Sequence, residues 1–167
     1  MDSEVFTGQA ITCGGWSLAL NMQWANTIVD AFELVKIPRA PNWLIGAANI
    51  DGNIIPVVDL SLYFVPNAAP MVIDRHHRIL VGGKREDNAE GVAGSDSVFA
   101  ILFSGLPIQI EYTREGIDAS HVIPERLHEL SLGMAKSHAA SGASGASKSH
   151  FEMNTDRFVD FLSLSLM

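Results

Sequence analysis

Two kinds of side chain in this sequence could do chemistry: an acid that closes an apolar run, and six histidines. Asp59 ends the stretch NIDGNIIPVVDL, and an acid at the end of a strand could serve as a general base. Acids in such places more often cap a turn or accept backbone N–H groups, and no second acid or base accompanies this one in the local sequence. We therefore expect Asp59 to be structural and the protein not to be an enzyme.

The histidines lack the spacing of a metal site. Adjacent residues on a strand point to opposite faces, which separates His76 from His77. The others have no cysteine or acidic cluster beside them, or lie in or beside a low-complexity segment; they are His121, His128, His138 and His150. The single cysteine, Cys13, is expected to be an inert, half-buried thiol. No phosphate-binding, zinc-protease or nucleophile-elbow motif is present, so we expect neither metal nor cofactor.

Charge and composition narrow the classes of partner. The 167 residues include 11 basic and 19 acidic side chains, for a net charge of −8, which disfavours nucleic acid and anionic membranes as partners. A lone cysteine fits a reducing compartment. The first residues do not resemble a signal peptide, and no apolar run approaches the roughly 20 residues of a membrane helix. A cytoplasmic protein that does not insert into membranes is therefore expected.

The elements that must position these residues are mostly strands. Apolar and polar residues alternate from Trp16 to Trp24, and Asp51-Gly52 is typical of a hairpin turn. Pro56 predicts an edge strand or one that begins after the proline. The remaining expected elements are two short strands within 26–37, a helical turn at 42–45, hairpin strands at 47–50 and 54–60, strands at 78–81, 98–103, 108–112 and 157–162, a short helix within 124–130, a polar loop at 84–97 and a flexible Ala/Ser/Gly loop at 135–150. This pattern predicts an all-β barrel fold with little helix.

The segment 38–64, PRAPNWLIGAANIDGNIIPVVDLSLYF, resembles the signature of the CheW-like domain. The matching positions are Pro41, Trp43, Gly46, Asn49, Gly52, Pro56, Val57, Val58, Asp59 and Leu60. Weaker resemblances occur over 99–106 and 156–167, so the likeness covers most of the chain from about residue 8. It implies a single domain over 1–167, in which two small SH3-like five-stranded barrels pack around a shared core.

The resemblance also implies a function, namely binding without catalysis. Such proteins are scaffolds of bacterial chemosensory arrays that couple a chemoreceptor to a CheA-like histidine kinase. One barrel surface would pair with the regulatory domain of the kinase, and an apolar groove between the barrels would receive the helical tip of the receptor. The partner-binding residues implied here are Thr27, Ile28, Val29, Asn49, Asp51, Gly52, Asn53, Val57, Ile101 and Phe103. The implied structural motif is Pro41, Gly46, Pro56, Asp59 and Leu60.

Three departures from the family pattern lie in or near these positions. Asp51 replaces the usual arginine of the turn, Thr27 replaces the glutamate that pairs with it, and Ser104-Gly105 replaces an acid followed by glycine. These departures suggest an accessory or specialised member, which serves a pilus-based or other non-flagellar pathway. A second reading is a decoy regulator that binds only one partner. A third is a small β-barrel enzyme or ligand-binding protein that uses Asp59 and the histidines.

Overall fold

The computed structural model describes residues 4–70, 72–83, 98–118, 122–137 and 148–165, which form nine strands and three helices. The strands are β1 (Val5–Cys13), β2 (Trp16–Asn21), β3 (Ala25–Val29), β4 (Leu44–Ile50), β5 (Asn53–Val58), β6 (His77–Gly82), β7 (Phe99–Glu115), β8 (Ser131–Ser137) and β9 (Lys148–Met153). The helices are α1 (Leu60–Phe64), α2 (Glu125–Leu130) and α3 (Thr155–Ser165). The predicted mostly-β fold is confirmed.

Strand pairing divides the sheet into two halves. In the first half, β1 pairs with β2, β2 with β9, β9 with β8, β8 with β7 and β7 with β1, which closes a ring of five strands. In the second half, the order is β3-β6-β7-β5-β4. Within the described residues no pairing joins β3 to β4, so this half is an open run of five strands.

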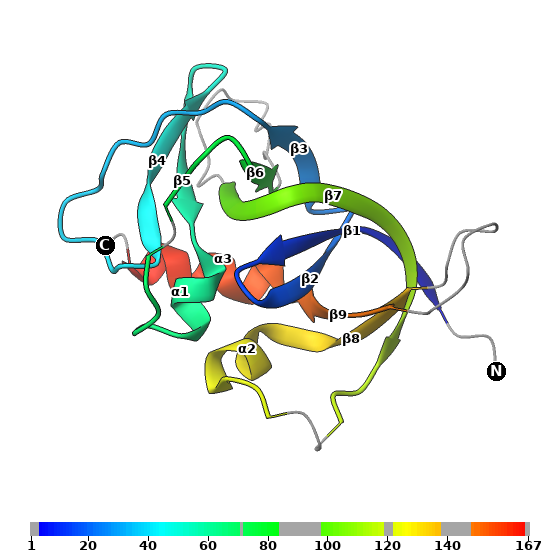
Figure 1. Ribbon diagram of the computed structural model, residues 1–167. Coiled ribbons are helices and arrows are strands. Elements are labelled where there is room, and N and C mark those ends of the chain that lie inside the picture. Colours follow the sequence, from blue (N-terminus) through cyan, green and yellow to red (C-terminus); the bar gives the residue numbers. More distant parts are fainter. Residues whose placement is uncertain (1–3, 71, 84–97, 119–121, 138–147, 166–167) are drawn as a thin grey trace, which may run out of the picture.

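Strand β7 belongs to both halves. Its first residues pair with β6 and β5, and from Ser104 onward it pairs with β1 and then β8. Figure 1 shows it as one long curved ribbon across the molecule. The separate strands predicted at 98–103 and 108–112 are therefore one, with Gly105 at φ 78° in the left-handed region that glycine tolerates.

Side-chain alternation along β7 separates two hydrophobic cores. Phe99, Ile101 and Phe103 enter the larger core, which also contains residues from all three helices. Ala100 and Leu102 enter the core of the second half, together with residues of β4, β5 and β6. A third, smaller core fills the closed ring. The continuous apolar run at 98–103 is thus explained by a strand that is buried on both faces.

The last strand predicted from the sequence is a helix. Helix α3 replaces the strand expected at 157–162 because Phe158, Phe161 and Leu162 have the spacing i, i+3 and i+4, which places them on one helical face. Phe158 and Leu162 are buried in the large core, and Phe161 packs against it. The side chain of Asn154 accepts a hydrogen bond from the backbone N–H of Arg157 and caps the helix.

Other sequence-based boundaries also change. Residues 44 and 45 begin β4 and do not form a helical turn, and β5 runs through Pro56 and ends at Val58. The second short strand expected before residue 37 is only one bridge, between Val35 and Ala47. Both ends of the expected 135–150 loop lie in β8 and β9, whereas 138–147 and the whole of the expected 84–97 loop lie outside the described residues. The helix expected within 124–130 is present as α2.

Candidate partner-binding surface

The tip of the β4–β5 hairpin is a two-residue loop. Ile50 pairs with Asn53, and between them Asp51 and Gly52 have φ values of 52° and 86°. Positive φ at both positions defines the tight hairpin turn for which Asp-Gly is favoured. The side chain of Asn49 accepts a hydrogen bond of 2.9 Å from the N–H of Gly52, and Asp51 is exposed. The Asp-Gly turn therefore presents a carboxylate to solvent.

A concavity of about 360 Å³ lies beside this tip and is lined by residues of β3 and of the β4–β5 hairpin, among others. Thr27 of β3 lines it together with Asp51 and Asn53 of the hairpin. Buried Ile55 and Val81 also line it, so apolar and polar side chains meet there. The structure thus brings together the two positions, 27 and 51, at which the family resemblance places a charge pair.

The other members of the predicted set that have accessible surface do not all line this concavity. Ile28 and Val29 are half-buried on β3, where Ile28 packs on the large core and Val29 on the core of the second half. Gly52 is exposed at the turn itself. Asn49 is exposed but lines a different and larger groove. The predicted set therefore does not form a single surface.

Three predicted partner-binding residues lie in the core. Val57 and Phe103 are 0% exposed and Ile101 is 1% exposed. Their place in the predicted set is wrong as far as direct contact is concerned, because a side chain without accessible surface cannot touch a partner. They instead pack beneath the surface, Val57 in the core of the second half and the other two in the large core.

Asp59 is a helix cap. Its carboxylate is buried and accepts hydrogen bonds from the backbone N–H groups of Ser61 (3.0 Å) and Leu62 (3.4 Å), at the start of α1. Leu60 is 2% exposed and begins the helix within the large core. The expectation that Asp59 is structural therefore agrees with the geometry, since two N–H groups that would lack partners at a helix start are satisfied.

The other three motif residues shape the chain around β4. Leu44 donates its N–H to the carbonyl of Pro41 in the turn that leads into β4. A Cβ at Gly46 would lie 2.8 Å from the carbonyl oxygen of Val35, so only glycine lets that segment approach. Pro56 pairs with Ala47, whose N–H and carbonyl both bond to Val35, so the missing proline N–H removes no bond between β4 and β5.

A larger groove of about 870 Å³ lies on the other side of the hairpin. Its walls come from the segment that joins β3 to β4, from the outer side of the hairpin, and from the residues that precede β6. Sequence reasoning missed this groove because residues 30–37 were interpreted as part of two short strands. The aliphatic pair Leu34-Val35, which lies between Glu33 and Lys36 in the sequence, was the signal that could have indicated it.

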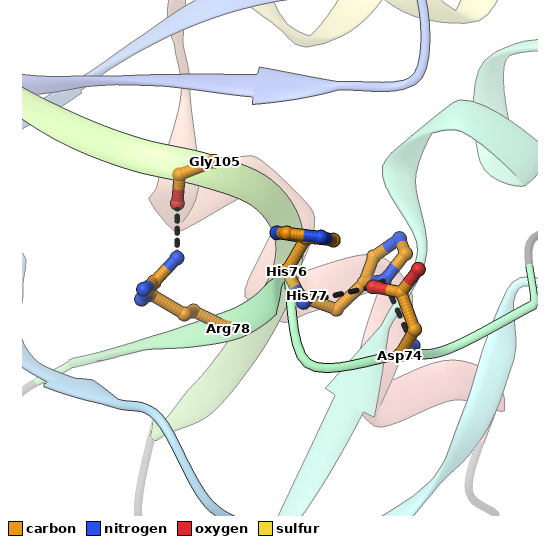
Figure 2. A network of polar contacts seen from close by, with 5 residues as sticks. All are labelled: Asp74, His76, His77, Arg78 and Gly105. Carbon is orange, nitrogen blue, oxygen red and sulfur yellow. Dashed lines mark hydrogen bonds and ion pairs between the residues drawn. The ribbon is translucent and has the colours of Figure 1, made fainter.

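Hydrogen bonds connect residues at one end of this groove (Figure 2). The carboxylate of Asp74 accepts from the N–H of His76 at 2.8 Å and lies 3.1 Å from Nδ1 of His77. These contacts, the His76 N–H first, lower the pKa of Asp74 below its ordinary value. Arg78 donates to the carbonyl of Gly105 at 2.7 Å, as Figure 2 shows. It also donates to Asp30 at 2.8 Å.

A buried ion pair was also missed. Both oxygens of the Glu152 carboxylate accept hydrogen bonds of 2.8 Å from the guanidinium of Arg114, and Tyr112 donates to the same carboxylate at 3.1 Å. The Glu152 side chain is 1% exposed and that of Arg114 is 39% exposed. The guanidinium also lies over the ring of Phe6, 4.5 Å from its centroid. These residues belong to three strands, so no local motif connects them.

The remaining reactive side chains do not assemble into a site. His150 is buried in β9, contrary to the flexible loop expected there, and its Nδ1 lies 2.5 Å from Oγ of Ser17. Cys13 is fully buried, so its pKa is raised. In the ranges that the structure covers, no three His, Cys, Asp or Glu side chains are grouped so that they could hold a metal ion. None of the helices in those ranges has the length and apolar character needed to cross a membrane.

Comparisons with known proteins agree with this architecture. The family model described as the CheW-like domain matches residues 8–140. The fold is similar to the crystal structure of the scaffolding protein TtCheW from Thermoanaerobacter tengcongensis, with a TM-score of 0.64 and 16% sequence identity over 90% of this chain and 89% of that one. At that level of identity, the likeness shows a shared fold. A search among curated proteins found no match.

Proposed function

The chain belongs to the CheW-like domain family, and on that premise we propose that it is a non-enzymatic scaffold of a bacterial chemosensory system. The observation that carries the proposal is the family match over residues 8–140, which includes strands of both halves of the sheet. The geometry supports a binding role: Asp59 caps a helix, and its carboxylate is 2% exposed and cannot readily reach a substrate.

The proposed partners are the regulatory domain of a CheA-like histidine kinase and the helical tip of a chemoreceptor. The proposed contact surface for the receptor tip is the concavity beside the hairpin tip, where Thr27, Asp51 and Asn53 meet. Exposed polar residues around an apolar floor are typical of the rim and centre of a docking site. The protein would act in the cytoplasm, where the kinase and the receptor tip meet.

Calorimetric titration tests this function. The protein is titrated separately with the isolated kinase regulatory domain and with a receptor-tip fragment from the same organism, and then with both together. A scaffold binds each partner and forms a ternary complex. If the protein fails to bind one or both of the partners, the proposal is overturned. This holds provided that both fragments are folded and that each binds a ligand already established for it.

A decoy regulator is the second candidate, and one observation favours it. Positions 27 and 51 meet at one concavity, but Thr27 is uncharged and Asp51 is an acid, so the charge pair implied by the family pattern is absent. A partner that depends on that pair would bind weakly here. In the same titrations, a decoy binds one partner and blocks the ternary complex.

A further inference from the structure

The larger groove exposes aliphatic side chains that a folded chain normally covers. Val35 and Ile54 are each 71% exposed, and Ile73 is 41% exposed, although all three line the same groove. They come from three separate segments, namely the β3–β4 connection, β5 and the segment before β6. Isolated exposed aliphatics are ordinary on protein surfaces, but a convergent set in a concavity indicates a docking surface.

A partner in this groove would contact mainly side chains and would find few backbone N–H and C=O groups to bond. β4 is the terminal strand of the sheet order, but Ala47 already exchanges both backbone hydrogen bonds with Val35. The alternation of an antiparallel ladder leaves Asn49 as the next outward-facing residue before the turn. An added strand would therefore gain few backbone bonds here, whereas the aliphatic stripe of an amphipathic helix would fill the groove.

The charges around the groove indicate which residue types should flank the aliphatic stripe of that helix. Asp30, Glu33 and Asp74 line it and are exposed, against Lys36 and against Arg78, which is paired with Asp30. The N–H of His76 and the contact with His77 lower the pKa of the Asp74 carboxyl. An acidic partner would be repelled by this rim, and a partner with lysine or arginine beside its apolar stripe would be attracted.

We propose that this groove docks an amphipathic helix of a partner protein whose aliphatic stripe is flanked by lysine or arginine. This surface is distinct from the hairpin-tip concavity proposed above for the receptor tip, and the inference does not depend on that function. Val35, Ile54 and Ile73 receive the aliphatic side chains. Glu33 and Asp74 face the basic flanks.

Fluorescence anisotropy with two designed peptides tests the proposal. One labelled helical peptide carries leucines at i, i+3, i+4 and i+7 with lysines on both flanks, and its match has glutamate for every lysine. We expect the lysine peptide to bind the full chain at least about tenfold more tightly than the glutamate peptide. We also expect that preference to shrink at high salt, because exposed charges are screened.

Matched variants then locate the binding. The double variant Val35→Ser with Ile54→Ser should weaken the lysine peptide about tenfold or more, and Glu33→Lys should weaken it several-fold. Val122→Ser, at a side chain that is 99% exposed outside the groove, and Glu111→Lys are the matched controls and should bind as wild type. Circular dichroism melts confirm that each variant is folded.

Three results would overturn the inference: equal affinity for both peptides, no binding of the lysine peptide, or groove variants that bind as the controls do. These outcomes involve neither kinase nor receptor, so failure here leaves the scaffold function standing. Conversely, peptide binding at the groove would persist if the titrations with the chemosensory partners failed.

Discussion

Thr27 of β3 and Asp51 at the tip of the β4–β5 hairpin line the same concavity, although their strands are not neighbours in the sheet. The strand order separates β3 from β5 by β6 and β7, so the open second half must curve to bring both side chains to one place. At this concavity the aspartate contributes a negative charge, and the threonine contributes none. A partner that docks at this concavity therefore meets a negatively charged surface.

Replacing Asp51 tests that surface. Asp51 has φ 52°, which asparagine tolerates about as well as aspartate, whereas arginine lacks a short polar side chain that can stabilise this conformation. We expect Asp51→Asn to change the free energy of unfolding by less than about 0.5 kcal/mol and Asp51→Arg to lower it by about 1 kcal/mol. Affinity for a receptor-tip fragment should change several-fold in Asp51→Arg and less at high salt.

Kinase-domain affinity is the internal control for these variants and should stay near the wild-type value. Calorimetric titrations of wild type, Asp51→Asn and Asp51→Arg against both partners provide the measurement. Identical receptor affinities for all three proteins would show that the hairpin tip is not part of the receptor contact.

Removing the helix cap should destabilise the fold. Asp59→Ala leaves the N–H groups of Ser61 and Leu62 without a side-chain acceptor in a buried place, which costs about 1–2 kcal/mol. Asp59→Asn retains an acceptor oxygen and should cost less. Urea unfolding gives both values. An equal loss in the two variants would mean that the negative charge, and not the acceptor, stabilises the start of α1.

The buried ion pair should show strong coupling. Arg114→Ala leaves the Glu152 carboxylate, 1% exposed, without its cation, and we expect a loss of about 2–4 kcal/mol after allowance for the partly exposed arginine. Adding Glu152→Gln removes the unpaired charge and should recover part of that loss. A double-mutant cycle by urea unfolding measures the coupling. Additive effects of the two substitutions would contradict the ion pair.

Acid should destabilise the protein through His150. Burial, with a contribution from Lys148, lowers its pKa below the ordinary value of 6.5. The unfolded chain therefore binds a proton at a higher pH than the folded chain does, so stability is retained above about pH 6.5 and falls as the pH drops toward the folded pKa. His150→Gln should flatten this part of the profile. The check is the urea midpoint of both proteins from about pH 7.5 to about pH 5, and parallel profiles would exclude His150 as the cause.

Local features of the chain were predictable because they depend on neighbouring residues. The Asp51-Gly52 turn follows from the positive φ that these residue types tolerate, and both residues have it. The continuous apolar run of 98–103 predicted a strand buried on both faces, which the division of its side chains between two cores explains. The segment 38–64 alone was specific enough to indicate the family.

The closing segment was not predictable from its own pattern. The apolar residues Phe158, Phe161 and Leu162 were interpreted as anchors of a strand, but their spacing also fits one face of a helix. The large core decided between the two, because it packs Phe158 against Trp43, Tyr63 and Phe99 from distant segments.

Long-range pairing alone decided which residues reach the surface. Val57 pairs with Ala100, and Ile101 pairs with Val58, on the parallel strands β5 and β7. Both side chains are buried there, which excludes the direct partner contact that the resemblance implied. Arg114 of β7 and Glu152 of β9 meet only in the assembled sheet, where β8 pairs with both of their strands. Such contacts join positions far apart in the chain, and their energy depends on burial that exists only once the sheet has formed.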